Sequence, residues 1–221
     1  GSGNDTLKNT KDIGATIYLG QGDDKVANSG LAADSIFCEE GSDTVMNSGR
    51  VGDKISLGDG FNRLANSGTI GGNVSGGNDR DIVKNTGLVG GVVNLGGGDD
   101  IYSGGNYIDQ VVNSAGSDNM NLGGGDDLYN ATGNFSSILD RSDIIDGGKG
   151  IDTYEASLAT QTVHINLDKT YHNLSPFDPG AGFMGAYTAA GYDIGGLATD
   201  TVRNFENIRS GSGNDMLYGS A

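Results

Sequence analysis

Leu19-Gly20-Gln21-Gly22-Asp23-Asp24 recurs in outline as Leu95-Gly96-Gly97-Gly98-Asp99-Asp100, four periods of nineteen residues further along the chain. A fixed period of this length is typical of a supersecondary unit stacked on itself, as in a solenoid. Carboxylates stacked at a strand spacing of about 4.8 Å repel one another unless a cation lies between them. The row therefore predicts both a solenoid and a cation as its ligand. Its members, with one amide among the acids, are Asp5, Asp24, Asp43, Asn62, Asp81 and Asp100.

Four rows of apolar residues follow the same nineteen-residue period. Within one coil the apolar residues alternate, as in Ile17-Tyr18-Leu19, which is the period of a strand and not of a helix. These rows predict an all-β fold, a parallel β-solenoid of stacked 19-residue coils with a dry core and two turns per coil. The rows are Leu7, Val26, Val45, Leu64, Val83, Tyr102; Ile13, Ala32, Val51, Ile70, Val89, Ile108; Ile17, Ile36, Ile55, Val74, Val93, Val112; and Leu19, Cys38, Leu57, Gly76, Leu95.

A row of asparagines, each followed by Ser or Thr, marks the second turn of the early coils. Stacked side-chain amides form hydrogen bonds from coil to coil, and Asn and Ser are typical turn residues. We interpret the row as an asparagine ladder that stabilises a turn; a polar binding face is the functional alternative. Its members are Asn9, Asn28, Asn47, Asn66 and Asn85.

After residue 112 the acidic residues are spaced differently. Asp118 and Asp127 are nine residues apart, as are Asp143 and Asp152, so both sides of the coil are expected to carry an acidic turn. Insertions are expected at about 103–115 and 130–140. The predicted organisation is 19-residue coils at 1–112, nonapeptide β-roll turns at 113–154, an irregular cap or spacer with a long loop at 155–209, and a restart of the repeat at 210–221.

Composition excludes several classes of function. The net charge is −16, with 13 Lys and Arg against 29 Asp and Glu, which disfavours nucleic acid and anionic membrane as partners and suits hard cations with oxygen ligands. One Cys and two His leave no internal disulfide and no Cys/His zinc cluster. No apolar run is long enough for membrane insertion.

The sequence offers no clear catalytic residue. Cys38 shares a row with Leu19 and Leu57 and is interpreted as a core residue. Neither His164 nor His172 has a recognisable catalytic partner.

Two segments match the glycine-rich nonapeptide G-G-x-G-x-D-x-U-x: Gly123-Gly124-Gly125-Asp126-Asp127-Leu128-Tyr129 and Gly147-Gly148-Lys149-Gly150-Ile151-Asp152-Thr153-Tyr154. Here the chain resembles the RTX, or haemolysin-type calcium-binding, repeat family of large bacterial secreted or surface proteins. The resemblance is specific over 116–154 and 200–219 and looser over 1–112.

The resemblance implies a parallel β-roll with Ca²⁺ held between successive turns by the sixth-position Asp and by backbone carbonyls of the glycine turn. The motif implies acidic ligands at its Asp positions and at Asp146. The nineteen-residue register extends the set of implied ligands into the early coils. The acids are Asp5, Asp24, Asp43, Asp81, Asp100, Asp118, Asp127, Asp143, Asp146, Asp152 and Asp215, and the turn residues are Gly20, Gly22, Gly96, Gly98, Gly123, Gly125, Gly148 and Gly150.

Three departures from the motif predict empty or altered sites around coils 43–62 and 81. Asn62 replaces Asp, Glu39-Glu40 replace glycines before Asp43, and Arg80 precedes Asp81. Asp34 and Asp53 align on another turn, but the equivalent positions in other coils are not acidic, which disfavours a metal there.

The function implied by the resemblance is a calcium-binding segment that folds when it meets Ca²⁺ outside the cell, as a structural and export module of a secreted RTX-type protein using type I secretion. The expected location is extracellular, secreted or at the cell surface. Expected partners are calcium ions, neighbouring repeats of the same parent chain, or surface glycan, with the segment itself a monomer. An adhesin or surface-layer stalk is the alternative. An enzyme acting on polysaccharide is not expected, because the few Lys and Arg are scattered.

Overall fold

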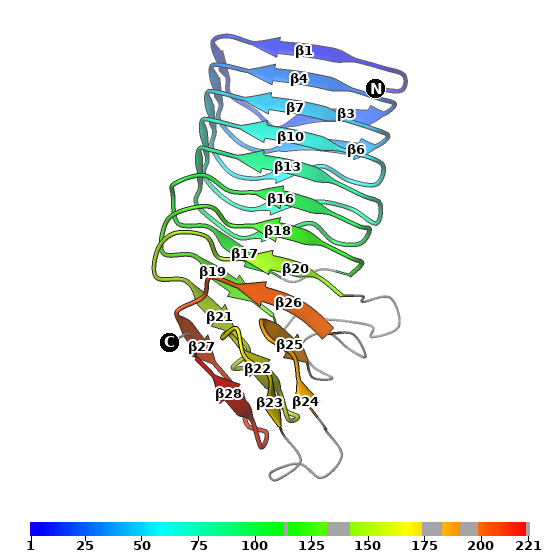
Figure 1. Cartoon of the computed structure of the whole chain (residues 1–221). Helices are drawn as coiled ribbons and strands as arrows, with labels where there is room; N and C mark the ends of the chain where they lie inside the picture. The colour runs from blue at the N-terminus through cyan, green and yellow to red at the C-terminus, as the bar shows by residue number, and fades with distance from the viewer. Residues whose placement is uncertain (113–114, 132–141, 174–182, 191–198, 220–221) are drawn as a thin grey trace.

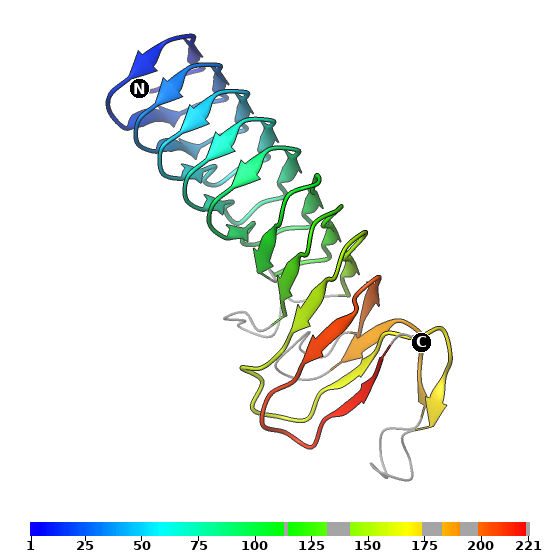
Figure 2. The same ribbon diagram turned by 90° about the vertical axis from the view of Figure 1, so that its left-hand side faces the viewer.

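The computed structural model describes residues 1–112, 115–131, 142–173, 183–190 and 199–219. These residues form an all-β structure in which parallel strands stack coil upon coil along one axis (Figure 1). Figure 2 shows the coils as successive rings that begin at the N-terminus and end at the C-terminal strands. The prediction of a parallel β-solenoid is confirmed.

Three sheets make up the faces of the solenoid. The long sheet consists, in spatial order, of β1 (Thr6–Asn9), β4 (Lys25–Asn28), β7 (Thr44–Asn47), β10 (Arg63–Asn66), β13 (Ile82–Asn85), β16 (Ile101–Ser103), β18 (Asn119–Asn121), β20 (Ile144–Asp146), β26 (Thr199–Arg203), β25 (Thr188–Ala190), β22 (His164–Asn166) and β28 (Met216–Tyr218). The short sheet consists of β14 (Leu88–Val89), β11 (Thr69–Ile70), β8 (Arg50–Val51), β5 (Leu31–Ala32) and β2 (Asp12–Ile13). The back sheet consists of β27 (Asn207–Arg209), β21 (Thr153–Glu155), β19 (Leu128–Asn130), β17 (Gln110–Val112), β15 (Val93–Asn94), β12 (Val74–Ser75), β9 (Ile55–Ser56), β6 (Ile36–Glu40) and β3 (Ile17–Gln21).

The early coils have three faces, one more than the two-turn coil expected from the sequence. The row that begins at Ile13 forms the short sheet, whose strands are only two residues long. Ala32, Val51 and Ile70 of this row are fully buried, so the row closes the third side of the core. Because the short sheet ends at β14, the later coils have only the long and the back sheet.

The coil becomes one residue shorter before residue 112, the point after which a change of spacing was predicted. Ile82 pairs with Ile101, but Ile101 pairs with Asn119 and Val93 pairs with Val111. The predicted insertion at 103–115 is therefore wrong, and so are two predicted core residues: Ile108 is 57% exposed, and Val111 rather than Val112 is buried. A shift of one residue exchanges the buried and exposed faces of a strand. The nineteen-residue spacing, continued into coils of eighteen residues, therefore predicts the wrong side chains as core residues.

The next coil is longer. Asn119 pairs with Ile144 and Leu128 with Thr153, each 25 residues on. The predicted insertion at 130–140 falls almost entirely on residues 132–141, which lie outside the described part of the chain.

The segment expected to be a cap contributes in part to the solenoid. β26 pairs in parallel with β20, and β27 pairs in parallel with β21, so Thr199–Arg209 adds a further coil. Before it, β22 and β25 form antiparallel pairs, and β28 lies parallel to β22. β23 (His172–Asn173) and β24 (Phe183–Met184) form a separate antiparallel pair. Much of the loop at 169–199 lies outside the described residues.

A row of buried asparagines lies beside the apolar rows of the interior. Asn28 Nδ2 donates to Asn47 Oδ1 at 2.8 Å and to the carbonyl of Arg50 at 3.1 Å, and the same pattern repeats from Asn9 to Asn66. These hydrogen bonds confirm an asparagine ladder with a structural role. Cys38 is fully buried among the apolar residues, as expected. Within the described ranges, nothing in the chain forms a helix of the length and apolarity that crossing a membrane requires.

Candidate cation site at the glycine-rich turns

The acidic row forms a continuous hydrogen-bonded ladder at the edge where each glycine turn leads into the long sheet. The backbone N–H of Asp24 donates to Asp43 Oδ1 at 2.8 Å, one coil further along. The N–H of Asp81 donates in the same way to Asp100 Oδ1 at 2.7 Å. One oxygen of each carboxylate therefore holds adjacent coils in register. Equivalent bonds join Asp5 to Asp24, Asp43 to Asn62, Asn62 to Asp81, Asp100 to Asp118, Asp118 to Asp143 and Asp143 to Asp200.

The second carboxylate oxygen has no such partner in several Asp residues of this row and of the row on the opposite corner of the coil. The Asp side chains are at most 2% exposed in the interior coils, yet Oδ2 accepts no hydrogen bond from any described residue in Asp109 and in five residues that follow a glycine-rich turn. A buried ionised oxygen without a donor is costly unless a cation compensates it. The five residues are Asp24, Asp43, Asp100, Asp127 and Asp152.

The backbone before these residues has one recurring conformation. The residues four and two positions before Asp100, Gly96 and Gly98, have φ of 94° and 114°. This left-handed region favours glycine, and the alternation turns successive peptide groups in opposite directions. The eight glycines predicted as turn ligands all share positive φ: Gly20, Gly22, Gly96, Gly98, Gly123, Gly125, Gly148 and Gly150.

The turn before Asp43 keeps this conformation despite its substitutions. Glu39 has a φ of 75° and Gly41 a φ of 130°, matching the glycines of the other turns. The Glu39-Glu40 substitutions, from which an empty or altered site was predicted, therefore leave the backbone conformation of the turn unchanged. A non-glycine residue in this region carries strain, which the stacked coils on both sides must sustain.

Asn62 shows what this turn presents to its ladder residue. Gly58 and Gly60 have the same positive φ, and Asn62 Nδ2 lies 2.9 Å from the carbonyl oxygen of each. Two carbonyl oxygens thus converge on the side-chain atom that is an amide nitrogen here and a carboxylate oxygen in the equivalent Asp residues. With Asp, three oxygens would converge with no proton between them, which is the start of a coordination shell for Ca²⁺, an ion that takes six to eight oxygens. The residues present therefore fit this ion.

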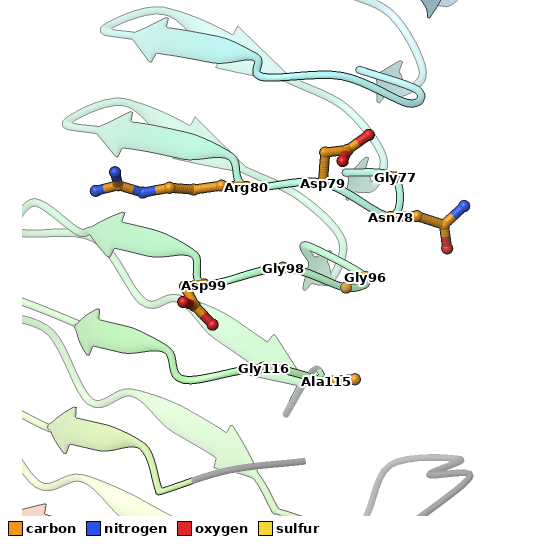
Figure 3. Close-up of a pocket in the computed structure, with 10 residues that line it drawn as sticks. Gly77, Asn78, Asp79, Arg80, Gly96, Gly98, Asp99, Ala115 and Gly116 are labelled. Atoms are coloured by element: carbon orange, nitrogen blue, oxygen red, sulfur yellow. The ribbon is translucent and has the colours of Figure 1, made fainter. Parts of the chain in front are cut away.

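Asp81 differs from the other members of the ladder. Neither Gly77 nor Asp79 has a positive φ, and the N–H of Gly77 donates to Asp81 Oδ2 at 3.3 Å. Figure 3 shows this turn beside the regular turn at Gly96–Asp99, with the side chains of Asn78 and Arg80 pointing in opposite directions. A pocket of about 570 Å³ lies between these turns and Ala115–Gly116.

A second acidic ladder continues the asparagine ladder on the opposite corner. Asn85 Nδ2 donates to Asp109 Oδ1 at 2.9 Å, and the N–H of Asp109 donates to Asp127 Oδ1 at 2.8 Å. The N–H groups of Asp127 and Asp152 continue it to Asp152 Oδ1 and Glu206 Oε2, both at 2.8 Å. Both sides of the later coils therefore carry acidic turns, as predicted.

Three members of these ladders could not be found from the repeat period of the sequence. Asp109 lies 18 residues before Asp127, so the nineteen-residue register that relates Asp34 to Asp53 does not reach it. Asp200 and Glu206 are 57 and 54 residues away from the residues whose N–H groups they accept, too far for a repeat period to find them.

Five predicted ligands lie outside the recurring arrangement or only partly within it. Asp5 is exposed in the outermost coil, preceded by Gly3 with a φ of 99°. Asp146 Oδ1 accepts the side-chain amide of Asn204 at 2.7 Å, and Asp215 Oδ1 accepts the N–H of Val163 at 3.0 Å. Asp118 and Asp143 are buried ladder members, but the turn before Asp143 lies outside the described residues.

Burial disfavours the ionised form of several ladder carboxyls. It raises the pKa of Asp100 to about 8; the N–H of Asp81 opposes this shift, and the nearby carboxylates of Asp118, Asp81 and Asp99 add to it. Burial likewise raises the pKa of Asp127 to about 7 and that of Asp43 to about 6. These side chains favour a proton or a metal cation as their partner.

We expect acid to stabilise the calcium-free protein. An unfolded Asp titrates near pH 4, whereas the folded values extend to about 8, so the folded state binds more protons throughout this window. The free energy of unfolding of calcium-free protein should therefore fall as pH rises from about 5 to 8. Urea unfolding of protein stripped on chelating resin measures this. With saturating calcium the order should reverse, because metal ligands must be deprotonated. A calcium-free protein that is more stable at pH 8 than at pH 5 would contradict the expectation.

Among the described residues, no group of three or more His, Cys, Asp or Glu side chains is arranged to hold a metal. The turns differ from such a cluster, because each combines a single ladder carboxylate with backbone carbonyls. Comparison with family models, with curated proteins and with solved structures finds no match.

Proposed function

We propose that this chain is a calcium-binding β-solenoid segment in which Ca²⁺ binds at the glycine-rich turns of both acidic ladders. The observation that carries the proposal is the buried Oδ2 that lacks a donor in Asp24, Asp43, Asp100, Asp127 and Asp152. Each follows a turn whose positive-φ pattern matches that of Gly58–Asn62, where two carbonyl oxygens converge on one side-chain atom.

The oxygen donors favour Ca²⁺ over Mg²⁺. Backbone carbonyls on a flexible turn suit the larger ion, which accepts six to eight oxygens in variable geometry, whereas Mg²⁺ demands a tight octahedron and loses its water reluctantly. The bound ion would supply the positive charge that the stacked carboxylates lack. In these five residues one carboxylate oxygen stays with the neighbouring coil, as Asp100 Oδ1 does, and the other is left for the ion.

Binding of this kind couples calcium to folding. An ion that binds only the folded chain stabilises it by mass action, so the solenoid would be loose where calcium is scarce and ordered where it is abundant. The resemblance to RTX repeats gives this coupling a biological setting: export of a loosely structured chain, followed by folding outside the cell. The secreted location and the export role are part of the same proposal.

The substitution Asp100→Asn tests the proposed ligand. An amide at this position can donate to the carbonyls of Gly96 and Gly98 as Asn62 does to Gly58 and Gly60. The variant should bind at least one Ca²⁺ fewer per chain by isothermal titration calorimetry and should be more stable than the parent without calcium. Asp99→Asn is the matched control, because Asp99 is exposed and its Oδ1, the acceptor for Ser117 N–H, is retained in Asn. Equal calcium binding by the two variants, or no binding by the parent protein, would refute the proposal.

A further inference from the structure

In two coils in the middle of the first acidic ladder, groups of the protein itself form the hydrogen bonds at the turn before the ladder residue. In the first, Asn62 Nδ2 occupies the position between the Gly58 and Gly60 carbonyl oxygens, at 2.9 Å from both. Asn62 is fully buried, so water does not compete for these hydrogen bonds. The amide nitrogen thus holds the place that the proposed function assigns to a cation in the other turns.

In the adjacent coil, which contains Asp81, a backbone N–H group takes the place of the cation. At Asp81 the turn abandons the positive-φ pattern, and the N–H of Gly77 points at Oδ2 instead of a carbonyl oxygen. Asp81 is fully buried, but its Oδ2 has a hydrogen-bond donor, unlike Oδ2 of Asp24, Asp43 and Asp100. A backbone donor here takes the place of the positive charge.

Positive side chains gather outside these same two coils. Arg63 Cζ lies 4.7 Å and Arg80 Cζ 5.8 Å from the centre of the Phe61 ring. Arg80 occupies the position taken by Asp99 in the next coil and by Asp23 two coils before Phe61. The chain thus adds fixed positive charge where its acidic ladder has no free carboxylate oxygen.

The hydrogen-bonded ladder nevertheless runs through this region without a break. The N–H of Asp43 donates to Asn62 Oδ1 at 2.9 Å, and the N–H of Asn62 donates to Asp81 Oδ1 at 3.1 Å. Strands β7, β10 and β13 pair in the same register as their neighbours. These coils therefore have their backbone and side-chain partners in place without any ion.

We infer that Asn62 and Asp81 define a metal-independent spacer, residues 58–85, which divides the first ladder into two separately loaded groups of cation sites. One group surrounds Asp24 and Asp43, and the other begins at Asp100. The inference rests on the proposed function, which supplies the cation, and assigns Asn62 as the residue that excludes it from the intervening turn. The spacer is then the part of the solenoid that stays ordered when calcium is removed.

The substitution Asn62→Asp tests the inference in the full chain. It restores three converging oxygens, so the variant should bind at least one more Ca²⁺ per chain than the parent by calorimetry, and should lose stability without calcium. Asn73→Asp is the control, because Asn73 is exposed and accepts the N–H of Val92 through an oxygen that Asp retains. It adds the same charge and should leave calcium binding unchanged.

Hydrogen exchange of the parent protein provides a second readout that does not depend on the variant folding. In chelator, amides of β10 and β13 should keep more protection than those of β4 and β18. If the parent binds calcium but Asn62→Asp adds none, or if β10 and β13 lose protection together with β4 and β18, the spacer is refuted. If the parent binds no calcium at all, the proposed function itself fails.

Discussion

Withdrawal of calcium is expected to unfold the coils around Asp24, Asp100 and Asp127 and to remove most of the stability of the chain. Calcium at about a hundred times the dissociation constant of a site contributes about 2.7 kcal/mol of stability. Two or three such sites contribute about 5–8 kcal/mol, comparable with the total stability of many domains, which is about 5–15 kcal/mol. Without the ion, buried carboxylates such as Asp100 and Asp118 also repel each other.

Circular dichroism and urea unfolding, recorded in chelator and again after calcium is restored, measure this effect. The β signal and the unfolding midpoint should fall in chelator and recover with calcium. Magnesium at the same concentration is the control and should restore much less, because its geometry does not suit the turn. Identical unfolding curves with and without calcium would contradict the account.

A single methyl group at Gly98 is expected to destabilise the protein by about 3 kcal/mol and to weaken calcium binding. Gly98 has a φ of 114°, and a Cβ there would lie 2.6 Å from the backbone nitrogen of Arg80. Strain at such a φ costs about 1–3 kcal/mol, and overpacking against backbone costs a similar amount. The clash also displaces a peptide group that the proposed site uses as a ligand.

Gly97→Ala is the matched control for Gly98→Ala. Gly97 precedes Gly98 in the same turn, has no positive φ, and a Cβ there would meet nothing closer than the Asn78 carbonyl oxygen at 3.5 Å. Its stability should stay within about 0.5 kcal/mol of the parent, as expected for a surface change. Urea unfolding in saturating calcium compares the two variants. Equal losses would mean that the turn conformation does not support the solenoid.

Much of this architecture could be predicted from the sequence, because a solenoid repeats its contacts. Rows such as Val26, Val45 and Leu64 lie on one another in the structure as their spacing predicts. The glycine positions were also predictable, since positive φ at Gly96 and Gly98 requires glycine. Periodicity therefore identified the long and back sheets and the acidic edge.

Prediction from the sequence fails where the repeat period changes, and where the backbone conformation does not follow from the residue type. The coil loses one residue between Asp100 and Asp118, and Ile108 was therefore assigned to the core although it is exposed. Glu39 adopts a φ that composition associates with glycine, because the coils stacked on it determine the turn. The role of Asn62 depends on where two carbonyl oxygens point, which residue identity alone does not reveal.

The two oxygens of each ladder carboxylate explain why the acidic row serves both the fold and the proposed site. Oδ1 of Asp100 accepts a backbone N–H from the previous coil and keeps the register. Oδ2 of the same residue has no donor among the described residues, and burial makes that state unfavourable. A hydrophobic residue at this position would lose the register, and an amide would lose the ion.

The most direct test of calcium binding at the glycine turns is an anomalous difference map from crystals grown in calcium. The account predicts peaks within about 2.3–2.6 Å of Oδ2 of Asp24 and Asp100, the distance typical of calcium–oxygen bonds, and no peak beside Asn62. Absence of a peak at Asp100 in saturating calcium, or a calcium ion between the Gly58 and Gly60 carbonyl oxygens, would contradict it.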